Sequence, residues 1–333
     1  MNTSVSELIN SSHLAAIADD ALKDEDNAAW VMELEPEIRR AWIERIGWIR
    51  LADRLAESDL LGAESGQFQS FCDAWRWLVA TDQVQPVGAY QAVFQAMHDR
   101  WFKRSSDLIA QRSIQSWNQY LSAIARYHQE NLIFEDLHQF EQMMEGLAAS
   151  FFQVLPFLEA HQWRIAGYFG VVDQFYNILR DLHEDAQQGI CYLPTEVLDR
   201  FGVSRDEILD FRAYENPGYR SMMQFWIYDY LPKLYRRAYP FILASDLHPS
   251  WQMLRDWSLN RYRRIERILR RCDYDYVRFP SVYWREVRRD LVLMLPGRFG
   301  TVAARSSAAF CDQTCKLVQL ANSKAPLEQY HCG

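Results

Sequence analysis

Apolar residues recur at helical spacing along almost the whole chain. In residues 36–58, Trp42, Ile46 and Ile49 fall on one side of a predicted helix, with Pro36 in its first turn. The same spacing predicts helices at about 67–80, 87–100, 104–129, 135–155, 161–186, 204–212, 217–238, 248–271, 281–294 and 301–322, separated by short connections such as 191–204. Because no strand-like alternation is long enough to build a sheet, we expect an all-α protein.

The predicted helices follow one another without an internal repeat or a linker. A single all-α domain over residues 26–322 is therefore expected. Residues 1–25 are expected to form a flexible N-terminus and residues 323–333 a C-terminal tail, because the ends of a chain seldom pack.

Composition narrows the class of fold. The 333 residues are 49% hydrophobic and 24% charged, which excludes disorder for most of the chain. Only 13 Gly and 11 Pro are present, too few for a loop-rich β-sandwich or a Gly-rich nucleotide-binding sheet. The aromatic content of 14%, with 12 Trp, is higher than a helical core of Leu, Ile and Ala needs.

The charge balance bears on the partners. A net charge of -8 argues against binding to the phosphate backbone of nucleic acid. Most of the basic residues are Arg, which can hold a small phosphorylated ligand through paired hydrogen bonds. The six Cys are scattered without zinc-ligand spacing, even at Cys311 and Cys315, and the N-terminus lacks signal-peptide features. We expect reduced thiols, a cytoplasmic location and no transmembrane segment.

An acidic cluster carries the clearest chemistry. Asp181, Glu184 and Asp185 are spaced i, i+3, i+4, so their carboxylates share one face of a helix and repel one another. Asn177 lies one turn earlier. A hard divalent cation such as Mg²⁺ would relieve the repulsion and could bind substrate phosphates as well. The alternative is an ordinary solvated, acidic helix end.

The longer string around this cluster identifies a family. Residues 177–194, NILRDLHEDAQQGICYLP, resemble the second acidic motif of the squalene and phytoene synthases, and FGVSRDEIL follows as in that family. Residues 262–280 are similar to the family's C-terminal pattern. The resemblance implies a single-domain helical bundle of the isoprenoid-synthase type. Its central active-site cavity would hold Mg²⁺ and prenyl diphosphate between two acidic walls.

The resemblance also implies roles for individual residues. Metal ligands would be Asp53 and Glu57 on the first wall, and Asp181, Glu184 and Asp185 on the second. Diphosphate would be held by Arg50, Arg180, Gln174 and Asn177. Arg54 stands where the family has a second Asp, so metal binding on the first wall would be reduced or reorganised. An ordinary solvated helix with an i, i+4 acid pair explains the first wall equally well.

Three further departures from the family pattern favour a changed acceptor. Ile190 replaces an expected Arg, and Asp173 replaces an apolar residue. Where the family carries basic residues, this chain has an aromatic stretch of Phe225, Trp226, Tyr228 and Tyr230. We expect Phe225 and Trp226 to form an acceptor and cation pocket, with Tyr228 and Tyr230 acting in catalysis. Asp173 would accept the proton of the acceptor ring, or it is simply an N-terminal or solvent-facing carboxylate. Asp181 is also expected to act in catalysis.

These observations lead to three functional hypotheses. The first is a Mg²⁺-dependent prenyltransferase that ionises one prenyl diphosphate, from dimethylallyl to farnesyl, and transfers the prenyl group to an aromatic small molecule. The second is head-to-head condensation of two prenyl diphosphates. The third is a non-catalytic assembly or interaction protein. The Arg-rich run 255–271 allows peripheral contact with a membrane, although pairing with acidic neighbours explains it more simply.

Overall fold

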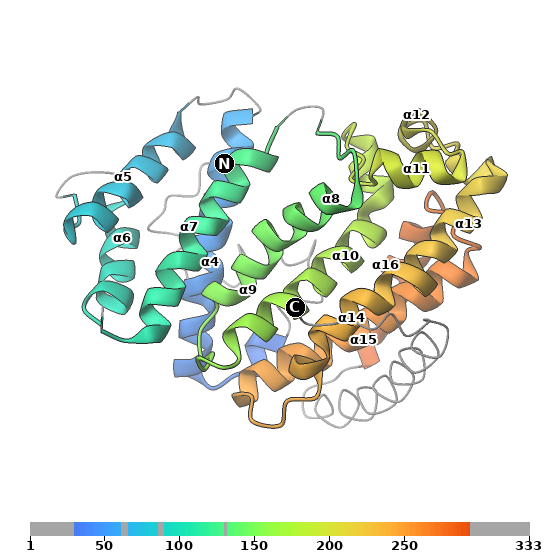
Figure 1. Ribbon diagram of the computed structural model, residues 1–333. Helices are drawn as coiled ribbons and strands as arrows, with labels where there is room; N and C mark the ends of the chain where they lie inside the picture. Colours follow the sequence, from blue (N-terminus) through green and yellow to red (C-terminus); the bar gives the residue numbers. More distant parts are fainter. Residues whose placement is uncertain (1–29, 61–65, 86–89, 105, 130–131, 294–333) are drawn as a thin grey trace, which may run out of the picture.

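The structure is a computed structural model that describes residues 30–60, 66–85, 90–104, 106–129 and 132–293 (Figure 1). Within these ranges the regular elements are helices and there is no strand, so the all-α prediction is confirmed. The predicted helix 301–322, Cys311 and Cys315, and both chain ends lie outside the described residues. The α-helices, labelled as in Figure 1, are α4 (Pro36–Leu60), α5 (Gln67–Thr81), α6 (Gln91–Met97), α7 (Leu108–Tyr127), α8 (Leu137–Met144), α9 (Ser150–Val154), α10 (Trp163–Gln187), α11 (Thr195–Phe201), α12 (Arg205–Leu209), α13 (Pro217–Phe225), α14 (Leu231–Ile242), α15 (Pro249–Arg271) and α16 (Phe279–Leu293).

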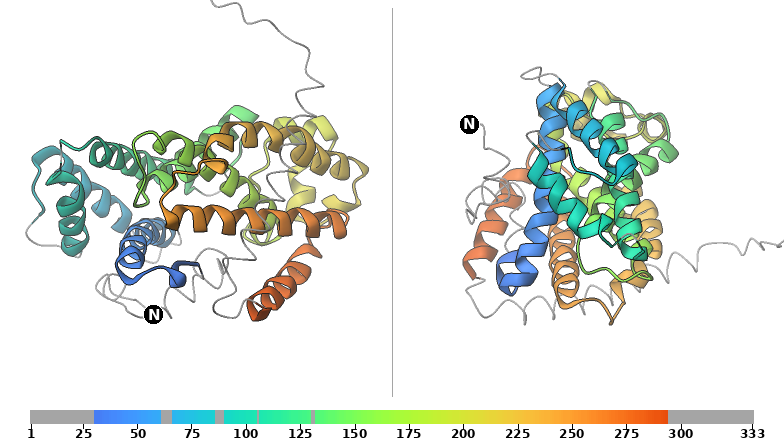
Figure 2. Two further views of the ribbon diagram at one scale, coloured as in Figure 1. Left: turned by 90° about the horizontal axis from the view of Figure 1, so that it is seen from below. Right: turned by 90° about the vertical axis from the view of Figure 1, so that its left-hand side faces the viewer.

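Shorter helical turns of other types complete the described chain. Two are 3₁₀ turns, η1 (Trp30–Glu33) and η4 (Ala213–Glu215). Three are π-helical turns, η2 (His98–Phe102), η3 (Glu145–Ala149) and η5 (Trp226–Tyr230), each continuous with α-helix on at least one side. The bundle is elongated, with α5 and α6 at one end and α11 to α13 at the other (Figures 1 and 2).

Helix α10 is the central element of the bundle. It packs against α14, α15, η3 and α9, and most of its length is buried. Two glycines allow the closest approach: a Cβ atom on Gly170 would lie 2.5 Å from the carbonyl oxygen of Ala148, and one on Gly167 would lie 2.6 Å from the Gln153 side chain. Small residues on α10 therefore bring η3 and α9 close to it.

Most of the aromatic residues build the core. Trp42 packs edge-on against Trp30 and Trp251, at ring-centre distances of 4.8 and 5.0 Å. A second cluster of rings joins α4, α5, η2 and α7, and contains Trp48, Trp75, Trp101 and Trp117. Bulky rings that pack edge to face can fill the space between helices of a bundle. Core packing therefore accounts for much of the aromatic content.

The helix predictions need two corrections. Residues 191–204, predicted as a connection, contain helix α11. This helix is missed because only Val197 and Leu198 of its seven residues are buried, too few for a helical period, and it ends at Gly202 with a φ of 63°. Residues 135–155 and 217–238, predicted as single helices, are interrupted by η3 and η5. Local propensity carries no signal for an inserted π turn.

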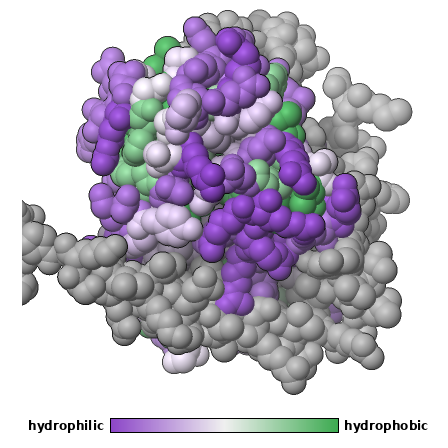
Figure 3. Space-filling view, turned by 90° about the vertical axis from the view of Figure 1, so that its right-hand side faces the viewer, coloured by the Kyte–Doolittle hydropathy of each residue, from purple (hydrophilic) through white to green (hydrophobic). Residues whose placement is uncertain are grey.

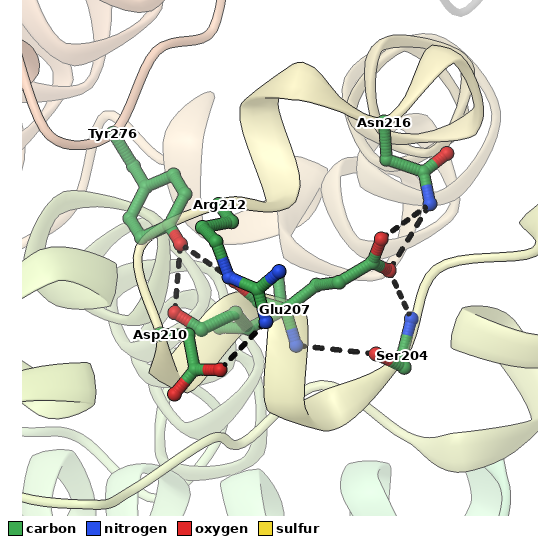
Figure 4. A network of polar contacts seen from close by, with 7 residues as sticks. Ser204, Glu207, Asp210, Arg212, Asn216 and Tyr276 are labelled. Atoms are coloured by element: carbon green, nitrogen blue, oxygen red, sulfur yellow. Dashed lines mark hydrogen bonds and ion pairs between the residues drawn. The ribbon is translucent and has the colours of Figure 1, made fainter.

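A polar network stabilises the end of the bundle formed by α11 to α13 (Figure 4). Ser204 and Glu207 form a reciprocal capping box at the start of α12. The side-chain amide of Asn216 donates to Glu207 and to the carbonyl of Gly202, and the Tyr276 hydroxyl donates to the carbonyl of Ile208 at 2.7 Å. These contacts attach the turn after α15 to the short helices.

The Arg-rich run in α15 is extensively ion-paired. Arg267 and Arg271 both contact Glu286 of α16, and Arg270 contacts Glu266. Among the described helices, none is long and apolar enough to cross a membrane. The face shown in Figure 3 is mostly hydrophilic where it is described, with small separate hydrophobic areas. The ion pairs of Arg267, Arg270 and Arg271 favour an ion-paired helix as the explanation of the Arg-rich run.

Candidate active site

A cavity of about 330 Å³ lies between α4 and α10. Arg50 and Asp53 enter it from α4, and Asp173, Gln174 and Asn177 enter it from α10. The other lining residues are mainly apolar or aromatic: Trp30, Trp42, Ile46, Tyr120, His128, Leu147, Ala148, Phe151, Phe152, Leu155, Tyr192 and Leu254. The cavity thus combines a polar zone, made by two facing helices, with an apolar remainder that suits a hydrocarbon chain.

The side of the cavity formed by α4 supplies one carboxylate and one guanidinium. Asp53 accepts a hydrogen bond of 2.7 Å from the Tyr120 hydroxyl on α7, which fixes the carboxylate. Arg50 lies almost one turn earlier on the same helix. Arg54 is not among the residues that line the cavity, so its charge reversal does not alter the cavity wall itself. Glu57 lies on α4 one turn beyond Asp53, but its side chain is outside the part of the chain that is described.

The side formed by α10 is highly ordered around Asp173. This carboxylate is 6% exposed, so the solvent-facing alternative is wrong. Its Oδ1 atom accepts from the buried guanidinium of Arg261 and from the Tyr262 hydroxyl, and its Oδ2 atom accepts from Asn177 at 3.4 Å. Both oxygens of this carboxylate are therefore already engaged by donors, and two of these donors belong to α15.

The acidic cluster lies farther along α10 and does not line the cavity. Arg180 is buried and forms a two-pronged ion pair with Asp181, with distances of 2.6 and 2.7 Å. Burial, reinforced by the charges of Asp181 and Glu184, raises the pKa of Asp185 to about 8. The three carboxylates are therefore close enough to repel one another, as their spacing predicts.

The oxygen atoms that line the cavity suit a hard divalent cation if substrate phosphates supply some of its ligands. In the described ranges, no group of three His, Cys, Asp or Glu residues converges closely enough to hold a metal ion alone. Mg²⁺ is usually held by one or two carboxylates together with phosphate oxygens. Asn177 Oδ1 is buried and has no hydrogen-bond partner within the described structure, and Asp53 lines the same cavity. An amide oxygen left open beside a carboxylate suits such a shared site.

The aromatic stretch 225–230 does not line the cavity. Phe225 and Trp226 are buried, and Trp226 packs against Phe140 of α8 and Phe175 of α10. Tyr230 is also buried, and its hydroxyl donates to Glu141. Tyr228 is 46% exposed on the surface. The expected acceptor pocket and the expected catalytic tyrosines therefore have no counterpart in this cavity.

The rings that do line the cavity come from distant parts of the chain. Tyr120 and Tyr192 are brought to it by α7 and by the connection after α10. Tyr120 carries no local sequence signal, whereas Tyr192 lies in the 177–194 string that resembles the family motif. Phe151 and Phe152 of α9 also line the cavity. Aromatic side chains thus surround the cavity, but sequence position alone predicted a different set.

The fold and the cavity together define a class of protein. An all-α bundle with a central cavity, polar where two helices face each other and otherwise apolar, has the architecture of an isoprenoid synthase. The family model for squalene/phytoene synthase matches residues 21–288. The chain belongs to this family, which confirms the resemblance in the acidic motif.

Individual relatives agree with this assignment. A 15-cis-phytoene synthase from Synechococcus elongatus is 33% identical over 129 residues, which are 38% of this chain and 40% of the relative. A presqualene diphosphate synthase from Zymomonas mobilis is 27% identical over 242 residues, 66% of this chain and 79% of the relative. The chain thus matches less than half of the length of the cyanobacterial phytoene synthase.

Solved structures support the fold. A dehydrosqualene synthase in complex with a ligand superposes with a TM-score of 0.56 at 18% identity, covering 83% of this chain and 95% of the other. Squalene synthase HpnC from Alicyclobacillus acidocaldarius gives a TM-score of 0.56 at 16% identity, covering 80% and 99%. These similarities confirm the squalene-synthase type of bundle.

The comparisons correct the leading functional hypothesis. The relatives are named as phytoene and presqualene diphosphate synthases, and none of those cited is named for an aromatic acceptor. Transfer to an aromatic acceptor has no support, since the cavity also lacks the aromatic stretch on which that hypothesis was based.

Proposed function

We propose that the protein catalyses the head-to-head condensation of two prenyl diphosphates with Mg²⁺. One observation supports this most directly: Arg50 and Asp53 of α4 and Gln174 and Asn177 of α10 line the same cavity, whose remaining walls are mainly apolar and aromatic. The polar zone suits the diphosphate group and the apolar walls suit the prenyl chain. Condensation of two prenyl groups agrees with the names of the relatives.

The chemistry places different demands on the two zones. The allylic C–O bond of one substrate breaks, and its electron pair leaves with diphosphate. The double bond of the second prenyl group supplies the electrons of the new C–C bond, and a proton is then lost. Arg50 would bind the departing diphosphate, and Gln174 would orient it. Asp53 and Asn177 would hold Mg²⁺, which supplies positive charge for the leaving group when bound. Trp30 and the other rings of the wall would exclude water from the cation and face it with their π-electrons.

The remaining predicted residues have a proposed role at the entrance to this zone. Asp181 follows Asn177 by one turn of α10, and Asp185 follows by two, so the three side chains form a stripe that leads away from the cavity. Glu57 follows Asp53 by one turn of α4. We propose that Glu57, Asp181, Glu184 and Asp185 bind further Mg²⁺ and that Arg180 holds Asp181 in position until diphosphate enters.

Product analysis tests the proposal. The full chain is incubated with Mg²⁺ and either farnesyl or geranylgeranyl diphosphate, and the formation of a C30 or C40 product and the release of diphosphate are measured. Asp53→Asn and Asn177→Ala should each lower kcat by about 100-fold, the usual effect of losing one group that stabilises developing charge. Asp73→Asn, at an exposed carboxylate on α5, is the matched control and should retain full activity.

Three results would contradict the proposal, and two of them would indicate another function. Full activity of Asp53→Asn would contradict its role at the diphosphate. Consumption of prenyl diphosphate only when a phenol or an indole is present would indicate aromatic prenylation. Failure to release diphosphate under either condition would favour the non-catalytic hypothesis.

A further inference from the structure

A second concave site lies on the other side of the wall formed by η3. It is a groove of about 670 Å³ between α7, η3, α10 and α14, helices that lie on the near side of the bundle in Figure 1, with α4 behind them. We call it the arginine groove, because Arg126, Arg164 and Arg237 line it. None of its lining residues also lines the cavity. Along η3 and its neighbours, Leu147 and Ala148 face the cavity and Ala149 faces the groove.

The groove is positively charged in an otherwise acidic protein. Its charged lining residues are three arginines and one glutamate, Glu145. The formal charge of the lining is therefore +2, whereas the net charge of the whole chain is -8. Arg237 forms an ion pair with Glu145. Arg126 and Arg164 have no ion-pair partner in the described part of the molecule, and both are exposed. Two guanidinium groups at one groove are therefore open to an anion.

The groove holds its guanidinium groups against rings and supplies further donors. The guanidinium carbon of Arg237 lies 4.6 Å from the ring centre of Tyr168, and that of Arg126 lies 5.2 Å from the ring centre of Tyr127. Contact with a ring restricts the positions that a long arginine side chain samples, which lowers the entropy lost on binding. The side-chain amides of Asn118, Gln119 and Gln142 also line the groove. The site thus offers many hydrogen-bond donors and a single carboxylate.

This arrangement selects the chemistry of the ligand. Planar guanidinium groups bind phosphate oxygens through paired hydrogen bonds, and two or three of them match a ligand with several anionic oxygens. A metal-bridged ligand is disfavoured because Glu145 is the only carboxylate and is already paired with Arg237. We propose that the arginine groove binds diphosphate directly, without a metal ion. The choice of diphosphate rests on the proposed function, which releases this ion from the neighbouring cavity.

Calorimetric titration of the full chain with sodium diphosphate in EDTA tests the site. Removal of Mg²⁺ suppresses metal-dependent binding in the cavity and leaves the groove. We expect one diphosphate per chain, with an affinity that falls as salt is added. Arg126→Gln and Arg164→Gln should each weaken binding about tenfold or more, because each removes charge-assisted hydrogen bonds. Glu145→Gln should strengthen binding by removing the one repelling charge.

Two controls locate the bound ion. Arg236→Gln removes an exposed guanidinium next to Arg237 that does not line the groove, and it should leave the affinity unchanged. Arg50→Gln alters the cavity and should also leave binding in EDTA unchanged. The three groove variants change exposed or half-exposed side chains, and unfolding curves that match the wild type would show that they remain folded.

The outcomes separate this proposal from the proposed function. No binding in EDTA, or binding that survives the double change of Arg126 and Arg164 to Gln, would overturn the groove site. Loss of binding in Arg50→Gln would place the ion in the cavity and would also overturn it. Normal binding of diphosphate in the groove by a chain that forms no condensation product would refute the proposed function and leave the groove site standing.

Discussion

Asp173 and Asn177 are one turn apart on α10, yet their surroundings give them different chemistry. Asp173 is surrounded by donors from Arg261 and Tyr262, so its carboxylate is committed to holding α10 and α15 together. Asn177 donates to Asp173 through its NH₂ group and keeps a buried carbonyl oxygen without a partner among the described residues. The residue with the less reactive side chain therefore provides the more available ligand atom.

The pKa of Asp185 gives a prediction for stability at the scale of one residue. The folded pKa is about 8, against the ordinary value of 3.8, so between these pH values the folded chain keeps a proton that the unfolded chain has lost. Stability should therefore fall as pH rises from about 4 to about 8, because the unfolded state is favoured by losing that proton. In EDTA, Asp185→Asn should remove this loss and be more stable than the wild type at pH 8.5, by up to about 5 kcal/mol.

Denaturant unfolding at several pH values provides the measurement. Asp199→Asn, which removes a carboxylate from the surface of α11, is the matched control and should keep the pH dependence of the wild type. An Asp185→Asn variant whose stability declines with pH as steeply as the wild type would show that the Asp185 carboxyl group is not the buried acid described here.

Among the elements, α10 is the one whose sequence was most informative. Its extent and the shared face of its acidic residues both follow from one stretch of sequence, because a long helix repeats its pattern many times. On α4, the resemblance to the family implied roles for Arg50 and Asp53, and both residues line the cavity. By contrast, α11 has two buried residues and η5 has a local geometry that no spacing rule describes. Short elements and π turns depend on tertiary packing, which local sequence does not contain.

The contact between α10 and η3 can be tested through Gly170. A Cβ atom there would lie 2.5 Å from the backbone oxygen of Ala148 and 2.8 Å from the Phe152 ring, so the two helices must move apart. Gly170→Ala should lower the free energy of unfolding by about 1–3 kcal/mol, the usual cost of overpacking. It should also raise KM for prenyl diphosphate, because Ala148 and Phe152 line the cavity.

Gly47 on α4 offers a matched control in the same type of element. Nothing lies within 4 Å of a Cβ atom at this position, so Gly47→Ala should stabilise the protein by about 0.5–1 kcal/mol through helix propensity. Chemical denaturation of both variants measures the difference. Equal and small effects of the two changes would mean that η3 does not approach α10 as closely as described.

At the scale of the whole molecule, the high aromatic content correctly indicated a cavity with aromatic walls, but the residues predicted to form those walls were wrong. Aromatic rings do surround the cavity, but they come from η1, α4, α7, α9 and the connection after α10 rather than from residues 225–230. Tyr120 reaches Asp53 across 67 positions of sequence, and such a contact is set by how the helices pack. The family resemblance therefore predicted a cavity and the place of Gln174 and Asn177 on its α10 side, while the fold determined which rings complete it.

Ligand binding should stabilise the molecule as a whole. With Mg²⁺ and an unreactive prenyl diphosphate analogue at 100 times its Kd, binding adds about 2.7 kcal/mol to the stability of the folded state. A chain of 333 residues has an unfolding entropy of about 0.7 kcal/mol/K, so Tm should rise by about 4 °C. Thermal unfolding followed by circular dichroism measures the shift.

The Tm increase of two variants shows whether the analogue binds in the cavity. Asp53→Asn should abolish most of it, because the variant loses a carboxylate of the cavity. Asp73→Asn should show the full increase in Tm. A shift of unchanged size in Asp53→Asn would place the bound analogue outside the cavity between α4 and α10.

The π turn η3 has a consequence for how this chain tolerates insertion and deletion. A π turn accommodates one more residue than the α-helical turn it replaces, and each residue of an α-helix rotates the chain by about 100°. Removal of one residue from η3 would restore a regular helix but would rotate every later side chain of α9 relative to α8. Phe151 and Phe152 would then turn away from their present positions at the cavity. The length of η3 is therefore fixed to the single residue, even though three of its five residues are Gly or Ala.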